Sequence, residues 1–572
     1  MSDVLFITPN IHGSVLDESV GTLLLATILQ NSGISVEIMQ FLQFGDIGDF
    51  DAFLNTALKK IKEKTPRIVS FYSRCDTYHI ALTLAKELKA CDPDLWIVFG
   101  GPQADITAEE TIKELPWVDF VCRGEGETTI VPFFTSLLNG SPDLSIPGLA
   151  YRGEDGVMLN PKPQLLQDLD SLPEVNYALL QHSDTVSGYF PVDVGRGCPF
   201  GCTYCSTKTF WGRKYRLKSP ERIVREICRA HEEFGATAFA FEHDMFTMKR
   251  DQVLRTCELM TQLDFPVTWK CSARMDCIDR EMIDTMAASG LDSIFVGIET
   301  GSARMQKLIN KNLKLGGVLD MLEYISSKGV KVTASFIYGF PEETLEDIEQ
   351  TLQMIAEISK IPGIVVQTHL CTFLPGTELS ARYMQDMTRA ESFSDIVGTN
   401  ALEECRGLIE AHPVLFNHFM EYKTPMRAKL EHFATFVKMW YYMHPVYAHI
   451  AARYEQLMQM YCDFVEANRD VLELHKKEGM EQRVMALLRQ DLFMRRFSDD
   501  EYYPMISDIY RFRITHTESL AVGESETDVY CFSPIELKNC SSLSDLSRGV
   551  YMVTRTKNQN GSIRVQVQGK KR

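Results

Sequence analysis

The stretch Gly195–Cys205 reads GRGCPFGCTYC and follows a short apolar run, Phe190–Val194, that predicts a buried strand. It contains three cysteines, Cys198, Cys202 and Cys205. Their spacing, Cys-x3-Cys-x2-Cys, places three thiolates on one tight loop, where they can bind three irons of a [4Fe–4S] cluster. Most such clusters have four cysteine ligands, but the next cysteine here is Cys228. The fourth iron therefore has an open coordination site, which indicates catalysis.

A zinc site or three incidental cysteines are the alternatives for this loop. Zinc requires a fourth cysteine or histidine, and the sequence has none at ligand spacing. Gly197 and Gly201 allow the loop to wrap around a larger group. The spacing therefore favours the iron–sulfur cluster.

The residues downstream of this loop predict repeated strand–helix units. We expect strands at 239–241, 267–269, 293–296, 332–337 and 364–366. Ser219 followed by Pro220 is typical of a helix start, and Thr344–Asp347 approximates a capping box. Repeats of this length predict a full or partial β/α barrel, in which chemistry collects at the C-terminal ends of the strands.

The residues upstream also alternate between apolar strands and helices. We expect strands at 4–7, 36–39, 68–71, 95–99 and 120–122. This order predicts an α/β domain with a doubly wound, Rossmann-like parallel sheet. Gly100, Gly101 and Gly124 follow two of the strands, at the edge where such sheets bind ligands and where a backbone can approach a bulky ligand closely.

The predicted organisation has four parts. These are the Rossmann-like domain at 1–145, a Pro- and Asp-rich connection at 146–187, the partial β/α barrel at 188–385 and a mostly helical C-terminal domain at 386–572. Residues 410–495 are rich in helix formers, and residues after Asp528 predict short strands. The stretch around Trp440 predicts a helix core, with a wall of a substrate cavity as the alternative.

Composition disfavours nucleic acid and a membrane as partners. The chain has 59 basic and 77 acidic residues, a net charge of −18, so nucleic acid is a poor default partner unless a local basic patch exists. No apolar run approaches the roughly 20 residues that a membrane span needs, and the first residues lack the basic segment of a secretory signal. The 15 cysteines are then most simply reduced thiols or metal ligands of a cytoplasmic protein.

The cysteine loop resembles that of the radical S-adenosylmethionine (SAM) superfamily. The resemblance implies that SAM chelates the open iron and that an electron donor, such as flavodoxin or ferredoxin, supplies the electron that cleaves it to a 5′-deoxyadenosyl radical. It also implies that Tyr204, just before the last cysteine, lies beside the adenine. Cys198, Cys202 and Cys205 are then the metal ligands and part of the catalytic machinery.

Other strand ends resemble motifs of the same family. Ser335–Glu342 resembles the adenine-contacting strand, although glycine is usual at Ser335; the resemblance assigns Ser335, Ile337 and Glu342 to SAM binding. Gly297–Ser302 resembles a Gly-x-Glu-Ser-Gly-Ser strand end, with Glu299 as its carboxylate. A helix cap or ion pair is the alternative for Glu299. Glu242 and Arg274 end two earlier strands as further cofactor-binding candidates, with surface ion pairs as the alternative.

The N-terminal domain resembles the cobalamin-binding domain fused to one large radical SAM class. Phe99–Ala104 and Val118–Glu127 carry the resemblance. It implies cofactor binding by Gly100, Gly101, Gly124 and Glu125.

The Asp-x-His-x-x-Gly motif, which supplies a histidine to cobalt, is missing, so no histidine on cobalt is expected. The resemblance implies that the loop with Arg74 faces the lower side of the corrin. A guanidinium there cannot donate a lone pair and would discourage other ligands from binding cobalt. A surface ion pair with Asp76 is the alternative for Arg74.

Together these features predict a cobalamin-dependent radical SAM enzyme. We expect transfer of a methyl group from SAM, through methylcobalamin, to a carbon of a small-molecule or peptide substrate. A cobalamin-dependent rearrangement, ring contraction or cyclisation without methylation is the alternative. A non-catalytic cobalamin or cluster sensor is the alternative from another class.

Overall fold

The computed structural model describes residues 2–10, 20–180, 188–391, 393–394, 401–476, 478–490, 493–497, 526–532, 548–557 and 563–570. The chain forms two compact units. The first consists of Met1–Phe295, Ile309–Lys311 and Cys371–Lys423, and the second of Val296–Leu308, Asn312–Leu370 and Thr424–Arg572.

A seven-stranded sheet with the order β2-β1-β3-β4-β5-β6-β7 lies in the first unit. Its first five strands are β1 (Val4–Thr8), β2 (Val36–Gln40), β3 (Ile68–Tyr72), β4 (Trp96–Gly100) and β5 (Phe120–Cys122). They pair in parallel, with Val4 opposite both Val36 and Ile68. The doubly wound parallel sheet predicted from the sequence is confirmed.

Two further strands extend this sheet within the segment that the sequence analysis treats as a connection. They are β6 (Leu149–Gly153) and β7 (Gly156–Leu159), joined antiparallel to β5 and to each other. Leu149 and Ala150 are buried at 1% and 0% exposure, whereas most of β7 is exposed. The surrounding prolines dominate the local pattern, and a short hairpin with a two-residue turn gives little periodicity of its own.

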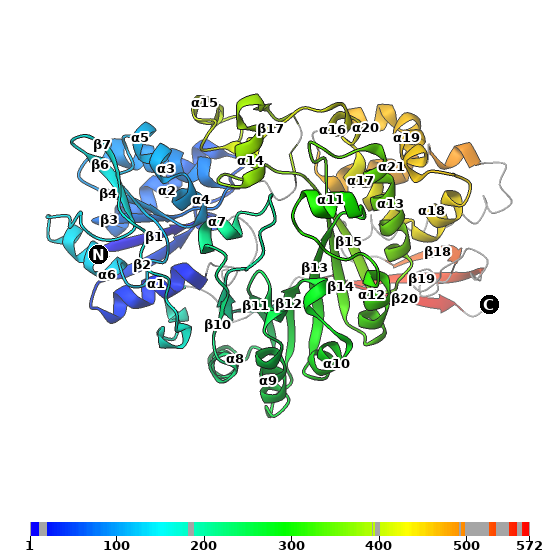
Figure 1. The fold of residues 1–572 in the computed structure, drawn as a ribbon, viewed down its shortest axis with the longest axis horizontal. Coiled ribbons are helices and arrows are strands. Elements are labelled where there is room, and N and C mark those ends of the chain that lie inside the picture. Colours follow the sequence, from blue (N-terminus) through cyan, green and yellow to red (C-terminus); the bar gives the residue numbers. More distant parts are fainter. Residues whose placement is uncertain are drawn as a thin grey trace. The chain divides into compact units, whose positions relative to one another are not determined.

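Helices cover both faces of this sheet (Figure 1). The face with α2 (Phe50–Lys64), α3 (Tyr78–Cys91) and α5 (Ala108–Glu114) has one apolar core, and the face with α1 (Val20–Asn31) and α6 (Ile130–Leu138) has another. The short helix α4 (Pro102–Ile106) follows β4.

A segment from much later in the chain completes the first of these cores. It includes α15 (Arg406–Ala411), and its buried residues are Ala401, Cys405, Ile409, Leu415, Phe416 and Phe419. The Gln103 amide donates to the Leu415 carbonyl at 2.8 Å, and the rings of Tyr78 and Phe416 lie 6.1 Å apart. Residues 401–419 therefore pack on the N-terminal domain, although the sequence suggests a separate C-terminal domain from residue 386.

The second large sheet has the order β15-β14-β13-β12-β11-β8. Its strands are β8 (Phe190–Asp193), β11 (Ala238–Glu242), β12 (Thr268–Ala273), β13 (Leu291–Glu299), β14 (Lys331–Tyr338) and β15 (Ile364–Leu370). The pairs β8/β11, β11/β12 and β14/β15 are parallel. With the helices between its strands, this six-stranded sheet forms a partial β/α barrel, as predicted.

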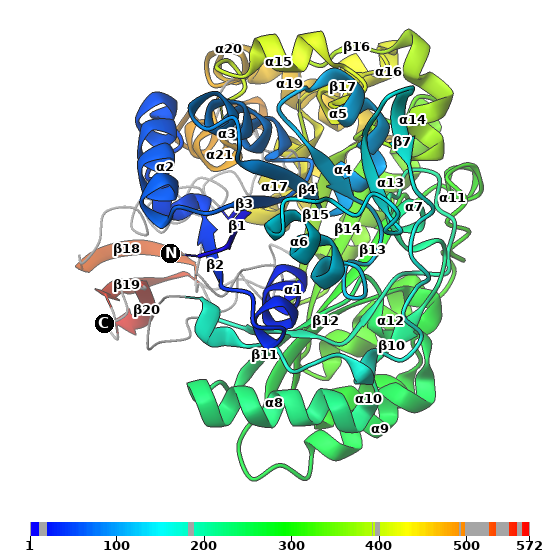
Figure 2. The same cartoon turned by 90° about the vertical axis from the view of Figure 1, so that its left-hand side faces the viewer.

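In the first unit, three helices follow strands of this sheet. They are α8 (Pro220–Phe234), α9 (Arg250–Met260) and α10 (Arg280–Ala288), which lie side by side in Figure 2. The Ser219 hydroxyl caps α8 by accepting from the Arg222 N–H at 3.1 Å, with Pro220 in the first turn. The predicted helix start at Ser219 is confirmed.

In the second unit, α11 (Ala303–Leu308), α12 (Val318–Ser327) and α13 (Leu345–Ser359) accompany β13 to β15. Thr344 and Asp347 form both bonds of the predicted capping box at the start of α13. The C-terminal helices are α16 (Pro425–Lys429), α17 (Phe433–Tyr442), α18 (His444–Ala451), α19 (Leu457–Ala467), α20 (Arg469–Leu474) and α21 (Met480–Gln490). Trp440 is 1% exposed within them, as expected for a helix core.

Three antiparallel strands follow these helices in the second unit. They are β18 (Glu526–Phe532), β19 (Arg548–Lys557) and β20 (Ile563–Lys570), in that order in their sheet. Strands are therefore present in the region after Asp528 where the sequence predicts them.

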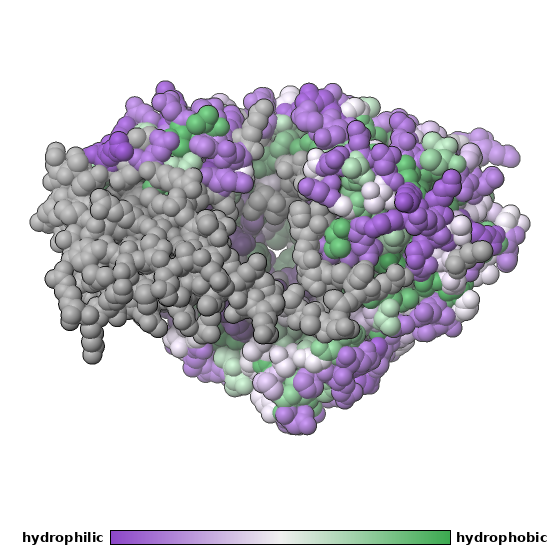
Figure 3. Space-filling model, turned by 180° about the vertical axis from the view of Figure 1, so that it is seen from behind, coloured by the Kyte–Doolittle hydropathy of each residue, from purple (hydrophilic) through white to green (hydrophobic). Residues whose placement is uncertain are grey.

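Figure 3 shows polar side chains interspersed with small, separate apolar patches on the described part of one face. Among the described residues, no helix combines the length and apolar character that crossing a bilayer requires.

We predict that Phe416→Ala destabilises the N-terminal domain by about 3–5 kcal/mol, because it removes a fully buried ring from the core under α3. Hydrogen exchange of the α3 amides measures the loss of protection. Val414→Ala is the control, because Val414 is 41% exposed and two residues away. Equal protection in both variants would contradict the packing of residues 401–419 on this domain.

Candidate active site

The three cysteines lie on the loop that follows β8 and the short strand β9 (Gly195–Arg196). β9 pairs antiparallel with β10 (Arg216–Leu217), so the two ends of the segment between these strands lie next to each other. Cys202 is 9% exposed, and Cys198 and Cys205 are half-buried. The loop therefore sits at the C-terminal end of the first barrel strand, as the sequence predicts.

Contacts from distant parts of the first unit hold the cysteine loop. The Thr203 N–H donates to the Ile309 carbonyl at 3.0 Å, and the Thr203 carbonyl accepts from the Leu379 N–H at 2.9 Å. The Asn310 amide donates to the Gly201 carbonyl at 2.9 Å. Gly197 has a φ of +81°, so a side chain there would be strained. These contacts fix the backbone of the loop at three points along the chain.

The donor set fits a cluster better than a single ion. In the part of the chain that the structure describes, one group of His, Cys, Asp or Glu has all its ligand atoms within 4.8 Å, and it does not include the three cysteines. Their sulfurs are therefore spaced more widely than the ligands of one zinc ion. Burial raises the pKa of the Cys198 and Cys205 thiols, so binding a cluster as thiolates must release protons.

Arg274 lies against this loop. Its Nη1 is 4.0 Å from Cys202 Sγ, and its guanidinium carbon is 3.9 Å from the centre of the Phe200 ring. Asp276 accepts from Nε at 2.7 Å, and the Lys311 carbonyl also accepts from Arg274. The side chain is a buried cation that forms an ion pair with Asp276 beside Cys202, and its cofactor-binding role stays a prediction.

The other polar residues near these strand ends have different surroundings. Glu242 is exposed at the end of β11, and its cofactor-binding role stays a prediction. The neighbouring His243 Nδ1 accepts from the Met245 N–H at 2.8 Å. Burial lowers the pKa of His243 to about 4, so it is neutral near pH 7.

Cys277, which is not among the site residues predicted from the sequence, lies near Cys198. Burial raises the pKa of Cys277 to about 11. Only its place after β12, three residues beyond Arg274, could have indicated this neighbourhood from the sequence.

In the second unit, Glu299 ends β13 and is 7% exposed with a φ of +71°. Left-handed backbone is unusual for a residue with a side chain and marks a constrained turn. Gln306 holds this turn by donating to the carbonyls of Ile298 and Thr300 at 2.7 and 2.9 Å. The turn presents a buried carboxylate at the end of a strand, which suits the predicted SAM contact.

Ser335 is 4% exposed within β14, opposite Gln367 of β15, and Ile337 is half-buried on the same strand. Glu342 is half-buried in the loop that follows. The next residue, Glu343, is not predicted from the sequence; its Oε2 accepts from the Gly339 N–H at 2.6 Å. Burial raises the pKa of Glu343 to about 8. The SAM-binding roles of Ser335, Ile337 and Glu342 stay predictions.

The predicted cobalamin-binding glycines differ in whether the local backbone and packing require a glycine at the position. A side chain on Gly101 would come within 2.9 Å of the Ser73 backbone, and Gly101 has a φ of +89°. Gly124 has a φ of +77°. Gly100 has neither constraint, since the nearest atom to an added Cβ is the Cys122 carbonyl oxygen at 4.0 Å. The missing side chain at Gly100 fits close approach of a ligand at this sheet edge.

Glu125 belongs to a buried ionic group that we call the Glu–Arg cluster. Its members are Glu125, Glu127, Arg196 and Arg216. Their side chains are 4–9% exposed. The Glu125 carboxylate is therefore taken up by protein groups in this structure, which disfavours the direct cofactor contact assigned to it from the sequence.

Arg74 lies in the loop after β3 and pairs with Asp76 at 2.9 Å, with 48% of its side chain exposed. This is the ion pair offered as its alternative, and its role toward cobalt stays a prediction. His79, the second residue of α3, is fully buried and packs against Phe419 with ring centres 5.3 Å apart. Because the His79 ring is buried in the core, it is not accessible to a ligand bound at the sheet edge.

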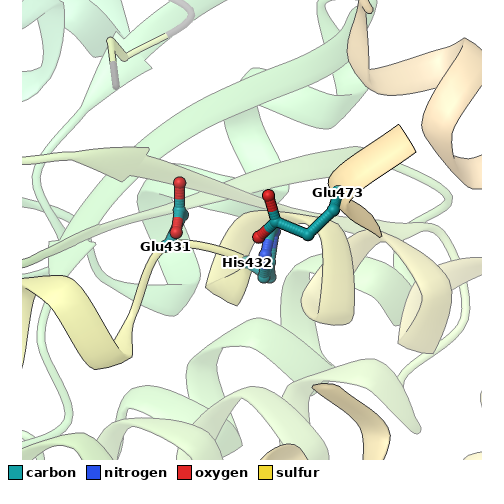
Figure 4. A group of neighbouring side chains, drawn as sticks. All are labelled: Glu431, His432 and Glu473. Carbon is teal, nitrogen blue, oxygen red and sulfur yellow. The ribbon is translucent and has the colours of Figure 1, made fainter. Parts of the chain in front are cut away.

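Glu431, His432 and Glu473 bring ligand atoms within 4.8 Å of one another in the second unit (Figure 4). The Lys476 ammonium lies 2.6 Å from the Glu431 carboxylate, and burial lowers the pKa of His432. One of the two carboxylates is therefore paired with a protein cation.

Comparisons with known families agree with this geometry. Residues 192–355 match the model of the radical SAM superfamily, and residues 18–133 match that of a B12 binding domain.

Named relatives include methyltransferases and cyclases. An uncharacterised methyltransferase of Pyrococcus horikoshii is 30% identical over 332 residues, covering 58% of this chain and 72% of that protein. The anaerobic magnesium-protoporphyrin IX monomethyl ester cyclase of Rubrivivax gelatinosus is 26% identical over 369 residues, covering 61% of this chain and 65% of that protein.

A solved structure has a similar fold. It is the radical SAM methyltransferase TsrM from Kitasatospora setae with tryptophan substrate and a SAM analogue bound. The TM-score is 0.59 at 16% identity, covering 76% of this chain and 88% of that one.

We predict that anaerobically reconstituted protein holds about four irons and four sulfides, and that replacing Cys198, Cys202 and Cys205 by Ala removes them together with the brown absorption. Iron and sulfide analysis measures the loss. Cys228→Ala is the control, because Cys228 lies on α8, outside the cysteine loop. A full cluster in the triple variant would contradict the ligand assignment.

We predict that Arg274→Gln lowers the midpoint potential of the cluster by tens of millivolts, where about 59 mV is a tenfold change in a one-electron equilibrium. Reduction adds negative charge, and the lost cation lies 4.0 Å from Cys202 Sγ. Redox titration followed by EPR measures the shift. Arg250→Gln, a pair-forming arginine on α9, is the control and should leave the potential unchanged. Equal potentials in both variants, with full iron content, would remove Arg274 from this role.

Proposed function

The chain belongs to the radical SAM enzymes that carry a cobalamin-binding domain, and from this premise we propose that it transfers a methyl group from SAM to a carbon of a small-molecule or peptide substrate. The observation that carries the proposal is that one compact unit combines a loop with three cysteines and a parallel sheet edge at which Gly100 leaves room for an added Cβ. The methyltransferase name of a relative supports it.

When bound, the cluster would supply an electron to SAM, and the cobalamin would carry the methyl group. The chain's own residues hold and orient these groups. Cys198, Cys202 and Cys205 bind three irons and leave the fourth for SAM. On our proposal Glu299 and the β14 residues contact SAM, and the glycines after β4 and β5 make room for the corrin. This division of labour relies on positioning rather than on acid–base chemistry.

One further partner and the surroundings of the cobalt follow from the proposed reaction. A low-potential electron donor such as flavodoxin or ferredoxin is needed to reduce the cluster. On the cobalamin side we propose that no histidine ligates cobalt and that Arg74 faces it. His79 is enclosed in the core, which supports the first statement, and Arg74 lies in a loop at the ligand-binding edge, which supports the second.

A rearrangement, ring contraction or cyclisation that uses the same cofactors is the second candidate. The cyclase name of one relative favours it, because that protein shares 26% identity over 369 residues. The two candidates use the same cluster and cobalamin sites and differ in whether the product gains a carbon.

We predict that methyl-deuterated SAM yields S-adenosylhomocysteine and places its label first in the cobalamin fraction and then on a carbon of the product. Mass spectrometry of the reduced holoenzyme measures both steps, and protein with the three cysteines replaced is the control. A cobalamin-dependent product without added methyl mass would favour the second candidate. Formation of neither S-adenosylhomocysteine nor 5′-deoxyadenosine would indicate a non-catalytic sensor instead.

A further inference from the structure

The Glu–Arg cluster joins two parts of the first unit that are far apart in the chain. Glu125 and Glu127 lie in the loop directly after β5, the last parallel strand of the cobalamin-binding sheet. Arg196 ends β9, two residues before Cys198, and pairs across the ladder with Arg216 of β10. The cluster therefore links the ligand-binding edge of one sheet to the first residue of the cysteine loop.

The contacts of Glu125 use both of its oxygens. Oε1 lies 2.7 Å from Arg196 Nη1 and 2.8 Å from Arg216 Nη2. Oε2 accepts from Arg216 Nη1 at 3.0 Å and from the Leu166 N–H at 2.7 Å. Burial alone would raise the pKa of Glu125, but the hydrogen bonds from Arg216 and Arg196 hold it below its ordinary value, so the carboxylate is charged.

The remaining contacts balance the charges of the cluster, whose side chains are nearly buried. Glu127 Oε1 lies 2.6 Å from Arg196 Nη2, which gives two anions and two cations. The ring of Trp211 lies 5.7 Å from the guanidinium carbons of both arginines. Such a buried group is tolerated only while every charge keeps its partner. A relative shift of the two segments would leave a buried charge unpaired, so the cluster favours one arrangement.

We propose that the Glu–Arg cluster fixes the distance between a bound cobalamin and the iron–sulfur cluster, with Glu125 as the central positioning residue. Leu166 adds the segment between the two domains to the same contact, so three parts of the chain meet at one carboxylate. This proposal rests on the proposed function, because it needs both groups in one chain. It goes beyond that function by assigning the spacing of the two cofactors to a charge cluster that contacts neither reacting atom.

Pulsed dipolar EPR on the reduced holoenzyme tests the proposal, because cob(II)alamin and the one-electron-reduced cluster are both paramagnetic. In E125Q we expect a distance distribution at least twice as wide as in the wild type, with iron and cobalamin contents unchanged. Methyl-label transfer to product should fall about 100-fold, since misplacement by about 1 Å can cost that much. E154Q is the matched control, since Glu154 is exposed in the turn between β6 and β7.

E125D keeps the charge on a shorter side chain and should broaden the distribution less than E125Q does. It also serves where E125Q does not accumulate as folded protein. Distributions as narrow as the wild type in the variants, with both groups bound, would overturn the proposal. Weaker cobalamin binding at an unchanged distance would also overturn it, by returning Glu125 to the cofactor. The distance is measured without turnover, so failure of methyl transfer in the wild type would count against the proposed function alone.

Discussion

Parallel pairing delivers the loop after every strand to one edge of its sheet, and both large sheets of this chain depend on that constraint. In the first sheet it gathers the loops after β3, β4 and β5, which contain Arg74, Gly101 and Glu125. In the part of the second sheet that belongs to the first unit, it places the cysteine loop after β8 and Arg274 after β12. Helices and apolar cores occupy the faces, so the edges alone are left for polar chemistry.

Short-range patterns made much of this architecture predictable. The cysteine spacing lies within eight residues, the strands are brief apolar runs, and the starts of α8 and α13 follow from adjacent side chains such as Ser219 and Thr344. The hairpin β6–β7 was not predictable because it is short and lies among prolines. The packing of residues 401–419 on the N-terminal core was not predictable for another reason: apolar periodicity indicates a buried face and does not identify the surface against which that face packs.

Burial, more than residue type, separates the roles of the polar side chains. Glu125 and Glu242 both follow strands, yet Glu125 is enclosed with two arginines and Glu242 is exposed. The partners of Glu125 lie 71 and 91 residues away, beyond any local pattern. Removing one member of such a buried pair typically costs about 3–5 kcal/mol, whereas an exposed pair such as Arg74–Asp76 contributes about 0–1 kcal/mol. A carboxylate after one strand thus takes part in a buried ion-pair cluster, whereas a carboxylate at the end of another strand stays accessible.

The packing of residues 401–419 on the N-terminal core also has a consequence for the synthesis of the protein. A ribosome must synthesise about 420 residues before Phe416 and Phe419 can cover the apolar surface of the first sheet. Until then the nascent N-terminal domain carries an incomplete core, and domains normally fold as units during synthesis. Translation therefore sets the order of assembly: the barrel strands emerge before the first domain is finished. A gene fragment cut at the apparent end of that domain would omit part of its own interior.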